Sequence, residues 1–119
     1  SRERIGAEMR KLLAAKDPAP SLASMALSGV LSGILPGSDH RALAPLVHLE
    51  GAHPPRWLRR LAVLGGDSVE TALRLSRAEA RDLAAISAAA RGTGSAAVLG
   101  WQLGVDNATD AILARAALV

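Results

Sequence analysis

Arginine is the residue type in this sequence whose spacing points most directly to chemistry. A guanidinium group presents several N–H donors in a planar fork, which matches the oxygens of a phosphate group. Six arginines fall in two short segments, and within each segment two of them are four residues apart, on one face of a helix. They are candidates for binding phosphate groups, and the alternative is a solvated helix face. The six are Arg56, Arg59, Arg60, Arg74, Arg77 and Arg81.

Neighbouring acidic residues indicate which of these arginines could be held in an ion pair within the same helix. Glu70 could pair with Arg74 at the i,i+4 spacing of a helix, whereas Arg77 and Arg81 have no acid three or four positions away within their helix. Trp57 lies among the first three arginines, and its helical spacing is more typical of a core residue than of a base-stacking platform.

No other pattern indicates catalysis or metal binding. The sequence has no cysteine, which excludes a thiol nucleophile and a cysteine-ligated zinc site. Residues 92–94, Gly-Thr-Gly, are too few for a phosphate-cradling loop and lack its lysine. A metal-dependent hydrolase using His40, His48 and His53 is the least favoured reading, because no His-x-x-x-His pair is present. We therefore predict no catalytic residue and no metal site in this sequence.

Composition favours an all-α fold. Alanine contributes 25 and leucine 19 of the 119 residues, whereas only 2% are aromatic. Alanine and leucine are strong helix formers, and strands need the β-branched and aromatic residues that are scarce here. The net charge of +3 rests on twelve arginines and two lysines, and it is a weak indication of a nucleic-acid partner.

Apolar spacing near 3.6 residues, interrupted by glycine and proline, predicts an irregular bundle of about eight short helices. Ser76 with Glu79 forms the pattern of a capping box, and Ser21 is the expected N-cap of the second helix. Pro45 predicts either a kink or a helix that begins near Leu43. The expected helices cover approximately residues 2–15, 22–28, 39–49, 54–64, 68–73, 77–91, 95–103 and 107–119, with a further helical turn after residue 30.

The ends of the sequence suggest part of a longer protein. Ser1 is not preceded by an initiator methionine, and residues 116–119 end on an apolar run without a cap. No apolar run reaches the roughly 20 residues of a membrane span, and no signal-peptide core is present. We expect a fragment without a membrane partner.

Four stretches, in order, have the form of known motifs. Residues 1–13 fit S-x-E-R-I-x-x-E-x-x-K-L-L, and residues 25–36 fit M-x-x-x-G-V-L-x-x-(I/L)-L-P. Two further short patterns follow, in residues 75–80 and in residues 101–104 with 110–116. This succession resembles the late neck and body of bacterial CCA-adding tRNA nucleotidyltransferases and related poly(A) polymerases. No single motif is highly specific, but the order spans nearly the whole chain.

The resemblance implies a division into residues 1–35, the end of a neck-like RNA-binding region, and residues 36–119, a helical body-like region packed with it as one unit. It implies that Glu3, Arg4 and Glu8 support a nucleotide-selecting helix rather than contact substrate. Locally, Arg4 and Glu8 are also spaced for an intrahelical ion pair.

The family's catalytic G-G-x-V-R-D and D-x-D motifs, and its nucleotide-selecting E-D-x-x-R motif in the neck, do not occur in the sequence. The resemblance therefore implies no cofactor for this chain, and it places Mg²⁺ and CTP or ATP in a head domain outside it. Implied partners are tRNA or another RNA 3′ region and the catalytic head and neck of the same cytoplasmic protein. The leading hypothesis is a non-catalytic RNA-binding portion of such an enzyme, and the alternative is a stand-alone helical protein–protein interaction domain.

Overall fold

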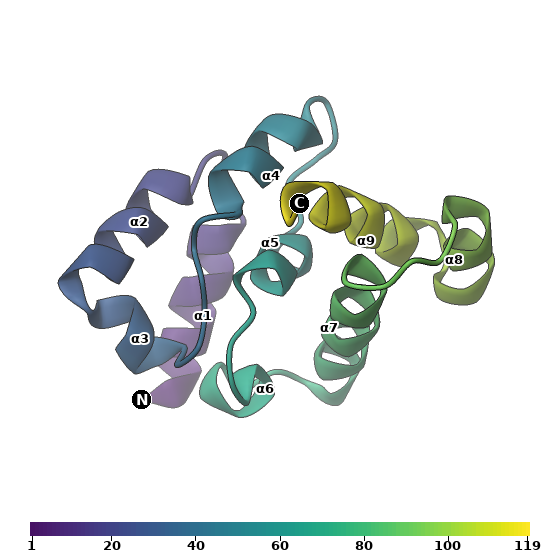
Figure 1. Ribbon diagram of the computed structural model, residues 1–119. Helices are drawn as coiled ribbons and strands as arrows, with labels where there is room; N and C mark the ends of the chain where they lie inside the picture. The colour runs from purple at the N-terminus through teal and green to yellow at the C-terminus, as the bar shows by residue number, and fades with distance from the viewer.

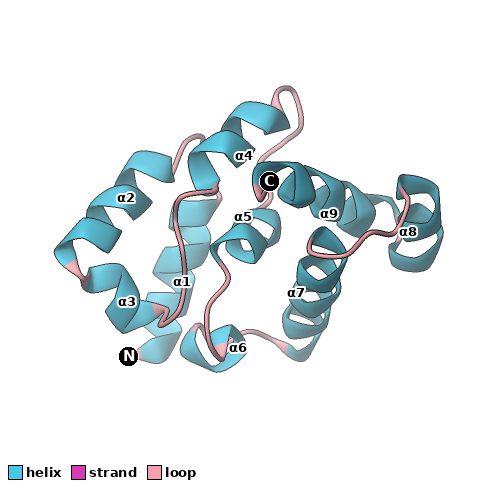
Figure 2. Cartoon of the chain, viewed as in Figure 1, coloured by secondary structure: helices cyan, strands magenta, loops and turns pink.

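The chain folds into nine α-helices without a β-strand, in a computed structural model that describes residues 1–119 (Figures 1 and 2). This confirms the all-α prediction, and the ninth helix is the short one after residue 30. No helix is long and apolar enough to span a membrane. The helices are α1 (Arg2–Leu13), α2 (Ala19–Ser28), α3 (Val30–Ile34), α4 (Leu43–Glu50), α5 (Trp57–Leu64), α6 (Val69–Ala72), α7 (Arg77–Ala90), α8 (Ala96–Leu103) and α9 (Val105–Ala117).

Helix α5 occupies the middle of the molecule. It packs against α1, α4, α7 and α9, and the six residues from Arg59 to Leu64 are all buried. Figure 1 shows α1, α2 and α3 on one side of α5 and α7, α8 and α9 on the other. The protein is 40 × 29 × 22 Å along its principal axes. A helix surrounded on all sides needs partners for every polar group it carries, which makes the arginines of α5 unusual.

Leucines from most of the helices build the main core around α5. Leu13, Leu22, Leu43, Leu61 and Ile86 are completely or almost completely buried there. A second, small cluster of Leu99, Ala108 and Ala111 joins α8 to α9. The side chain of Trp101 on α8 remains 88% exposed.

Local signals explain several helix boundaries. The Ser76 side chain accepts a hydrogen bond from the Glu79 backbone N–H, and the Glu79 carboxylate accepts one from the Ser76 N–H, which confirms the predicted capping box. Helix α4 begins at Leu43, which is the second of the two alternatives predicted from Pro45. Pro45 therefore lies in the first turn of the helix, where proline is tolerated. The predicted N-cap at Ser21 is wrong, because α2 already begins at Ala19.

Gly6 permits the close approach of α1 to the turn that follows α6. A Cβ atom at this position would lie 2.2 Å from the carbonyl oxygen of Leu73, far inside van der Waals contact. Because the obstructing atom belongs to the backbone, a rotamer change cannot relieve the clash. Only glycine fits here without a shift of α1.

We predict that Gly6→Ala lowers the free energy of unfolding by about 1–3 kcal/mol, the usual effect of overpacking. Urea denaturation measures the change. Gly100→Ala is the matched control, because a Cβ atom there meets nothing within 4 Å. Alanine is the better helix former, so the control should gain up to about 1 kcal/mol. Equal effects of the two substitutions would contradict the packing argument.

Candidate nucleic-acid interface

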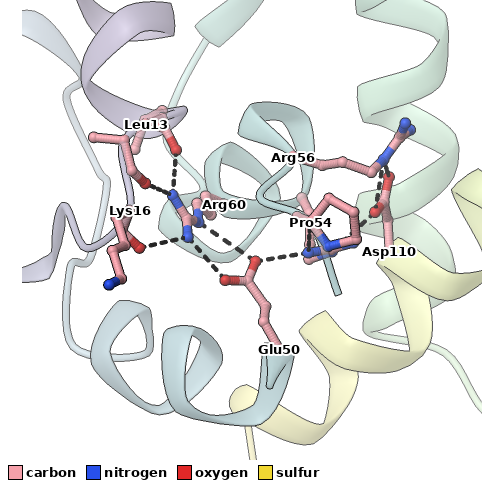
Figure 3. Close-up of polar contacts among 9 residues, drawn as sticks. Leu13, Lys16, Glu50, Pro54, Arg56, Arg60 and Asp110 are labelled. Carbon is pink, nitrogen blue, oxygen red and sulfur yellow. Dashed lines mark hydrogen bonds and ion pairs between the residues drawn. The ribbon is translucent and has the colours of Figure 1, made fainter. Parts of the chain in front are cut away.

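Two of the six candidate arginines point into the protein interior. Arg59 and Arg60 are each 1% exposed, and both bind the buried carboxylate of Glu50. Figure 3 shows Arg60 directed toward this carboxylate. Arg59 Nη1 donates to Glu50 Oε2 at 2.7 Å, and Arg60 Nη2 donates to Glu50 Oε1 at 2.9 Å. Glu50 ends α4, so this carboxylate joins α4 to α5.

Arg60 also satisfies the C-terminal end of α1. Its Nη1 donates to the carbonyl oxygens of Leu13, at 2.7 Å, and Ala15, and its Nη2 donates to that of Lys16 at 3.1 Å (Figure 3). The last carbonyls of a helix have no partner within the helix, and they lie at the negative end of its dipole. A guanidinium group at this point supplies both hydrogen-bond donors and positive charge.

A second buried carboxylate, Asp110 on α9, accepts hydrogen bonds from the other side of α5. It is 0% exposed, and it accepts from Arg59 Nε at 2.9 Å and from Arg56 Nε at 2.8 and 3.0 Å. Burial raises the pKa of Asp110 above its usual value, and the two arginines act against that rise. The ion-pair network therefore contains three guanidinium groups, Arg56, Arg59 and Arg60, and two carboxylates, Glu50 and Asp110.

Arg10 joins α1 to the start of α7. Its Nη2 donates to Glu79 Oε1 at 2.9 Å and, at 3.4 Å, to the carbonyl oxygen of Arg74. The same guanidinium lies 5.2 Å from the centre of the Trp57 ring, within cation–π range. Hydrogen bonds from Arg10 and from the Ser76 backbone hold the pKa of Glu79 below its usual value. Trp57 packs against the core, in agreement with its predicted role.

Arg74, Arg77 and Arg81 are exposed, and no carboxylate lies within ion-pair distance of any of them. The expected pair of Glu70 with Arg74 does not form, because α6 ends at Ala72. Arg74 instead adopts a left-handed backbone with φ of 53° in the turn before α7. These three side chains carry free guanidinium groups into solvent next to the residues that Arg10 contacts.

Helix α1 adds further exposed charge. Glu3, Arg4 and Glu8 are exposed and make no ion pair, so the intrahelical pair expected between Arg4 and Glu8 is not formed. Their proposed support of a neighbouring helix stays a prediction. Other exposed cations without a carboxylate partner are Arg2, Lys11, Lys16 and, after α7, Arg91.

Arg41, by contrast, is neutralised locally. Its guanidinium donates to Asp39 at 2.8–3.1 Å, and these bonds lower the pKa of Asp39 to about 2. Both side chains are largely exposed, so the pair is a surface ion pair of small energetic value.

The three histidines do not assemble a metal site. No group of three or more histidine or carboxylate side chains is placed to hold a metal ion. His48 and His53 are exposed and His40 is half-exposed.

The sequence reasoning missed Glu50 and Asp110, the two acids of the ion-pair network. Each lies on an apolar helix face: Glu50 follows Leu43 and Leu46 at helical spacing, and Asp110 precedes Ala114 and Ala117 in the same way. A carboxylate on the buried face of a predicted helix indicates that a cation must meet it there. That signal was present in the sequence.

Comparison with known families concerns the first third of the chain. Residues 1–41, which contain α1 to α3, match the family model described as "Probable RNA and SrmB-binding site of polymerase A". No curated protein and no solved structure matches the chain. The chain is therefore similar to the RNA-binding region of polymerase A over residues 1–41, about a third of its length.

Proposed function

We propose that this chain is a non-catalytic, RNA-binding portion of a nucleotidyltransferase that adds CCA or poly(A) to RNA 3′ ends. Residues 1–35 would be the end of its neck-like region and residues 36–119 its body-like region. Mg²⁺ and CTP or ATP would bind a catalytic head outside this sequence, and that head is a further expected partner.

The proposal rests on one contact. Helix α1, which lies within the family match, touches the turn before α7, where Arg74 and the other unpaired arginines begin. Arg10 bonds the backbone of Arg74 and the side chain of Glu79. Arg77 and Arg81 extend along the outer face of α7 from this point, four residues apart. Free guanidinium groups on a rigid helix are suited to the regularly spaced phosphates of an RNA backbone.

The ion-pair network divides the six arginine candidates: Arg56, Arg59 and Arg60 belong to it, whereas Arg74, Arg77 and Arg81 do not. Arg59 and Arg60 bind carboxylates and carbonyls in the interior, so their main contribution is to hold α1, α4, α5 and α9 together. Arg74, Arg77 and Arg81 are the residues we propose for contact with RNA phosphate at the outer surface. Contacts of this kind position RNA without reading its sequence.

Salt dependence of tRNA binding tests the proposal. We expect binding to weaken steeply between about 50 and 200 mM salt, because each phosphate contact releases condensed counterions. Arg77→Gln should reduce the slope of log K against log salt by about 1. Fluorescence anisotropy with labelled tRNA measures both quantities.

Arg41→Gln is the matched control, because it removes the same charge from a guanidinium that Asp39 already holds. Its slope should equal that of the wild type. A wild-type chain without measurable tRNA affinity at low salt would contradict the proposal and favour the helical protein–protein interaction domain instead. Extension of tRNA 3′ ends by the chain alone, with Mg²⁺, CTP and ATP supplied, would contradict the proposal that this chain is non-catalytic.

A further inference from the structure

A cleft lies where the α4–α5 connection meets the start of α9. Its volume is about 430 Å³, and its walls combine apolar surface with several polar side chains. The residues that matter for its chemistry are His53, Arg56, Arg59, Asp106 and Thr109. The cleft borders the ion-pair network, because Arg56 and Arg59 belong to both.

Both arginines bring unused hydrogen-bond donors to this cleft. Arg59 uses Nε and Nη1 for Asp110, Glu50 and the Pro54 carbonyl, and its Nη2 has no acceptor in the protein. Arg56 uses only Nε, again for Asp110. Figure 3 shows the far end of the Arg56 guanidinium directed away from Asp110. The Arg59 side chain is 98% buried, but its Nη2 atom is not enclosed by the protein, so this donor is free to bind a ligand in the cleft.

The charge of the network favours an anion as the partner. Three guanidinium groups face two buried carboxylates, which leaves one positive charge uncompensated. Asp106 does not cancel it effectively, because its carboxylate is 80% exposed and lies 3.9 Å from Arg56 Nη1, beyond hydrogen-bond distance. The cleft therefore offers donors and positive charge to a ligand that carries only acceptors.

We propose that this cleft binds a phosphate group, with Arg56, Arg59 and the Thr109 hydroxyl as donors. Two guanidinium forks and a hydroxyl match the several acceptor oxygens of phosphate better than the two oxygens of a carboxylate. The phosphate can belong to an RNA backbone or to a free nucleotide or phosphate ion. Only the RNA source rests on the proposed function; binding of the phosphate group does not.

Titration of the chain with inorganic phosphate, at constant ionic strength set by chloride, tests the site by NMR. We expect saturable shifts of the Arg56 and Arg59 side-chain N–H signals and of the Thr109 amide. Arg56→Gln should weaken phosphate binding at least about tenfold, the effect of removing a charged hydrogen-bond donor. Thr109→Val should also weaken it, and it leaves the ion-pair network unchanged. Arg41→Gln is the control with the same loss of charge, because Asp39 already holds that guanidinium, and its phosphate affinity should equal that of the wild type.

Asp106→Asn gives a result that loss of folding cannot imitate. Removing the carboxylate that faces Arg56 should strengthen phosphate binding by about twofold to fivefold, in line with the weak effect of an exposed charge. Shifts that do not saturate, or that saturate in Arg56→Gln at the same phosphate concentration as in the wild type, would overturn the site.

A competition arm separates the two sources of phosphate. RNA that displaces inorganic phosphate from the cleft supports a backbone phosphate as the natural ligand. RNA that binds only through Arg77 leaves the phosphate site in place and overturns its assignment to RNA. Failure of RNA to bind at all contradicts the proposed function but not the phosphate titration.

Discussion

Replacing Arg60 with methionine is expected to lower the free energy of unfolding by about 3–5 kcal/mol, the range for breaking a buried ion pair from one side. Methionine fills a similar volume but donates no hydrogen bond. The substitution leaves the carbonyls of Leu13, Ala15 and Lys16 without their donor and removes one of two cations from Glu50. Chemical denaturation followed by circular dichroism measures the loss.

Two further variants make the Arg60 prediction specific. Arg41→Met removes an arginine from an exposed ion pair, and it should change stability by less than about 1 kcal/mol. Arg60→Lys keeps the charge but cannot bond Glu50 and three carbonyls with one ammonium group, so it should remain clearly destabilised. A lysine variant as stable as the wild type would show that charge alone, without the geometry of the fork, accounts for the effect.

Asp110→Ala is the second large effect, again about 3–5 kcal/mol in the free energy of unfolding. Arg59 is almost completely buried, and Asp110 is the acceptor for its Nε as well as for Arg56. Without the Asp110 carboxylate, the buried guanidinium of Arg59 loses one of its two anionic partners and keeps only Glu50. The same denaturation experiment measures the change.

Asp106→Ala provides the comparison on the same helix. Asp106 faces the same Arg56, but it is 80% exposed and 3.9 Å away, so its removal should cost less than about 0.5 kcal/mol. If the variants at 106 and 110 lose the same stability, burial is not what makes Asp110 important. Should Asp110→Ala fail to fold, Asp110→Asn retains one acceptor and the shape of the side chain, and it should fall between the alanine variant and the wild type.

The helices were predictable because their signals are local. Ser76 and Glu79 are three residues apart, and their reciprocal bonds need nothing beyond the first turn of α7. Gly29 ends α2 with φ of 86°, a conformation that glycine adopts without strain. Boundaries such as the start of α2 were less well predicted, because an expected serine cap competed with a proline in the first turn.

The roles of the arginines were not predictable in the same way. Arg59 and Arg77 both lie in arginine-rich helical segments, but one is buried and the other is exposed. The difference depends on Asp110, which lies 51 residues from Arg59 in the sequence and reaches it only when α9 packs on α5. The position of Asp110 on an alanine face predicts that it needs a buried cation, but a helical pattern does not say which one. Spacing within a segment therefore predicts helix faces, and packing decides which face meets solvent.

Arg60 recognises main-chain oxygens at the end of α1, and these atoms are present whatever the side chains are. Ala15 and Lys16 are exposed, so their side chains take no part in the contact. Substitution at positions 15 and 16 should therefore be tolerated freely, whereas position 60 accepts few replacements. A chimaera that receives a foreign α1 would keep the hydrogen bonds from Arg60 to these carbonyls, as long as the foreign helix ends at the same residue.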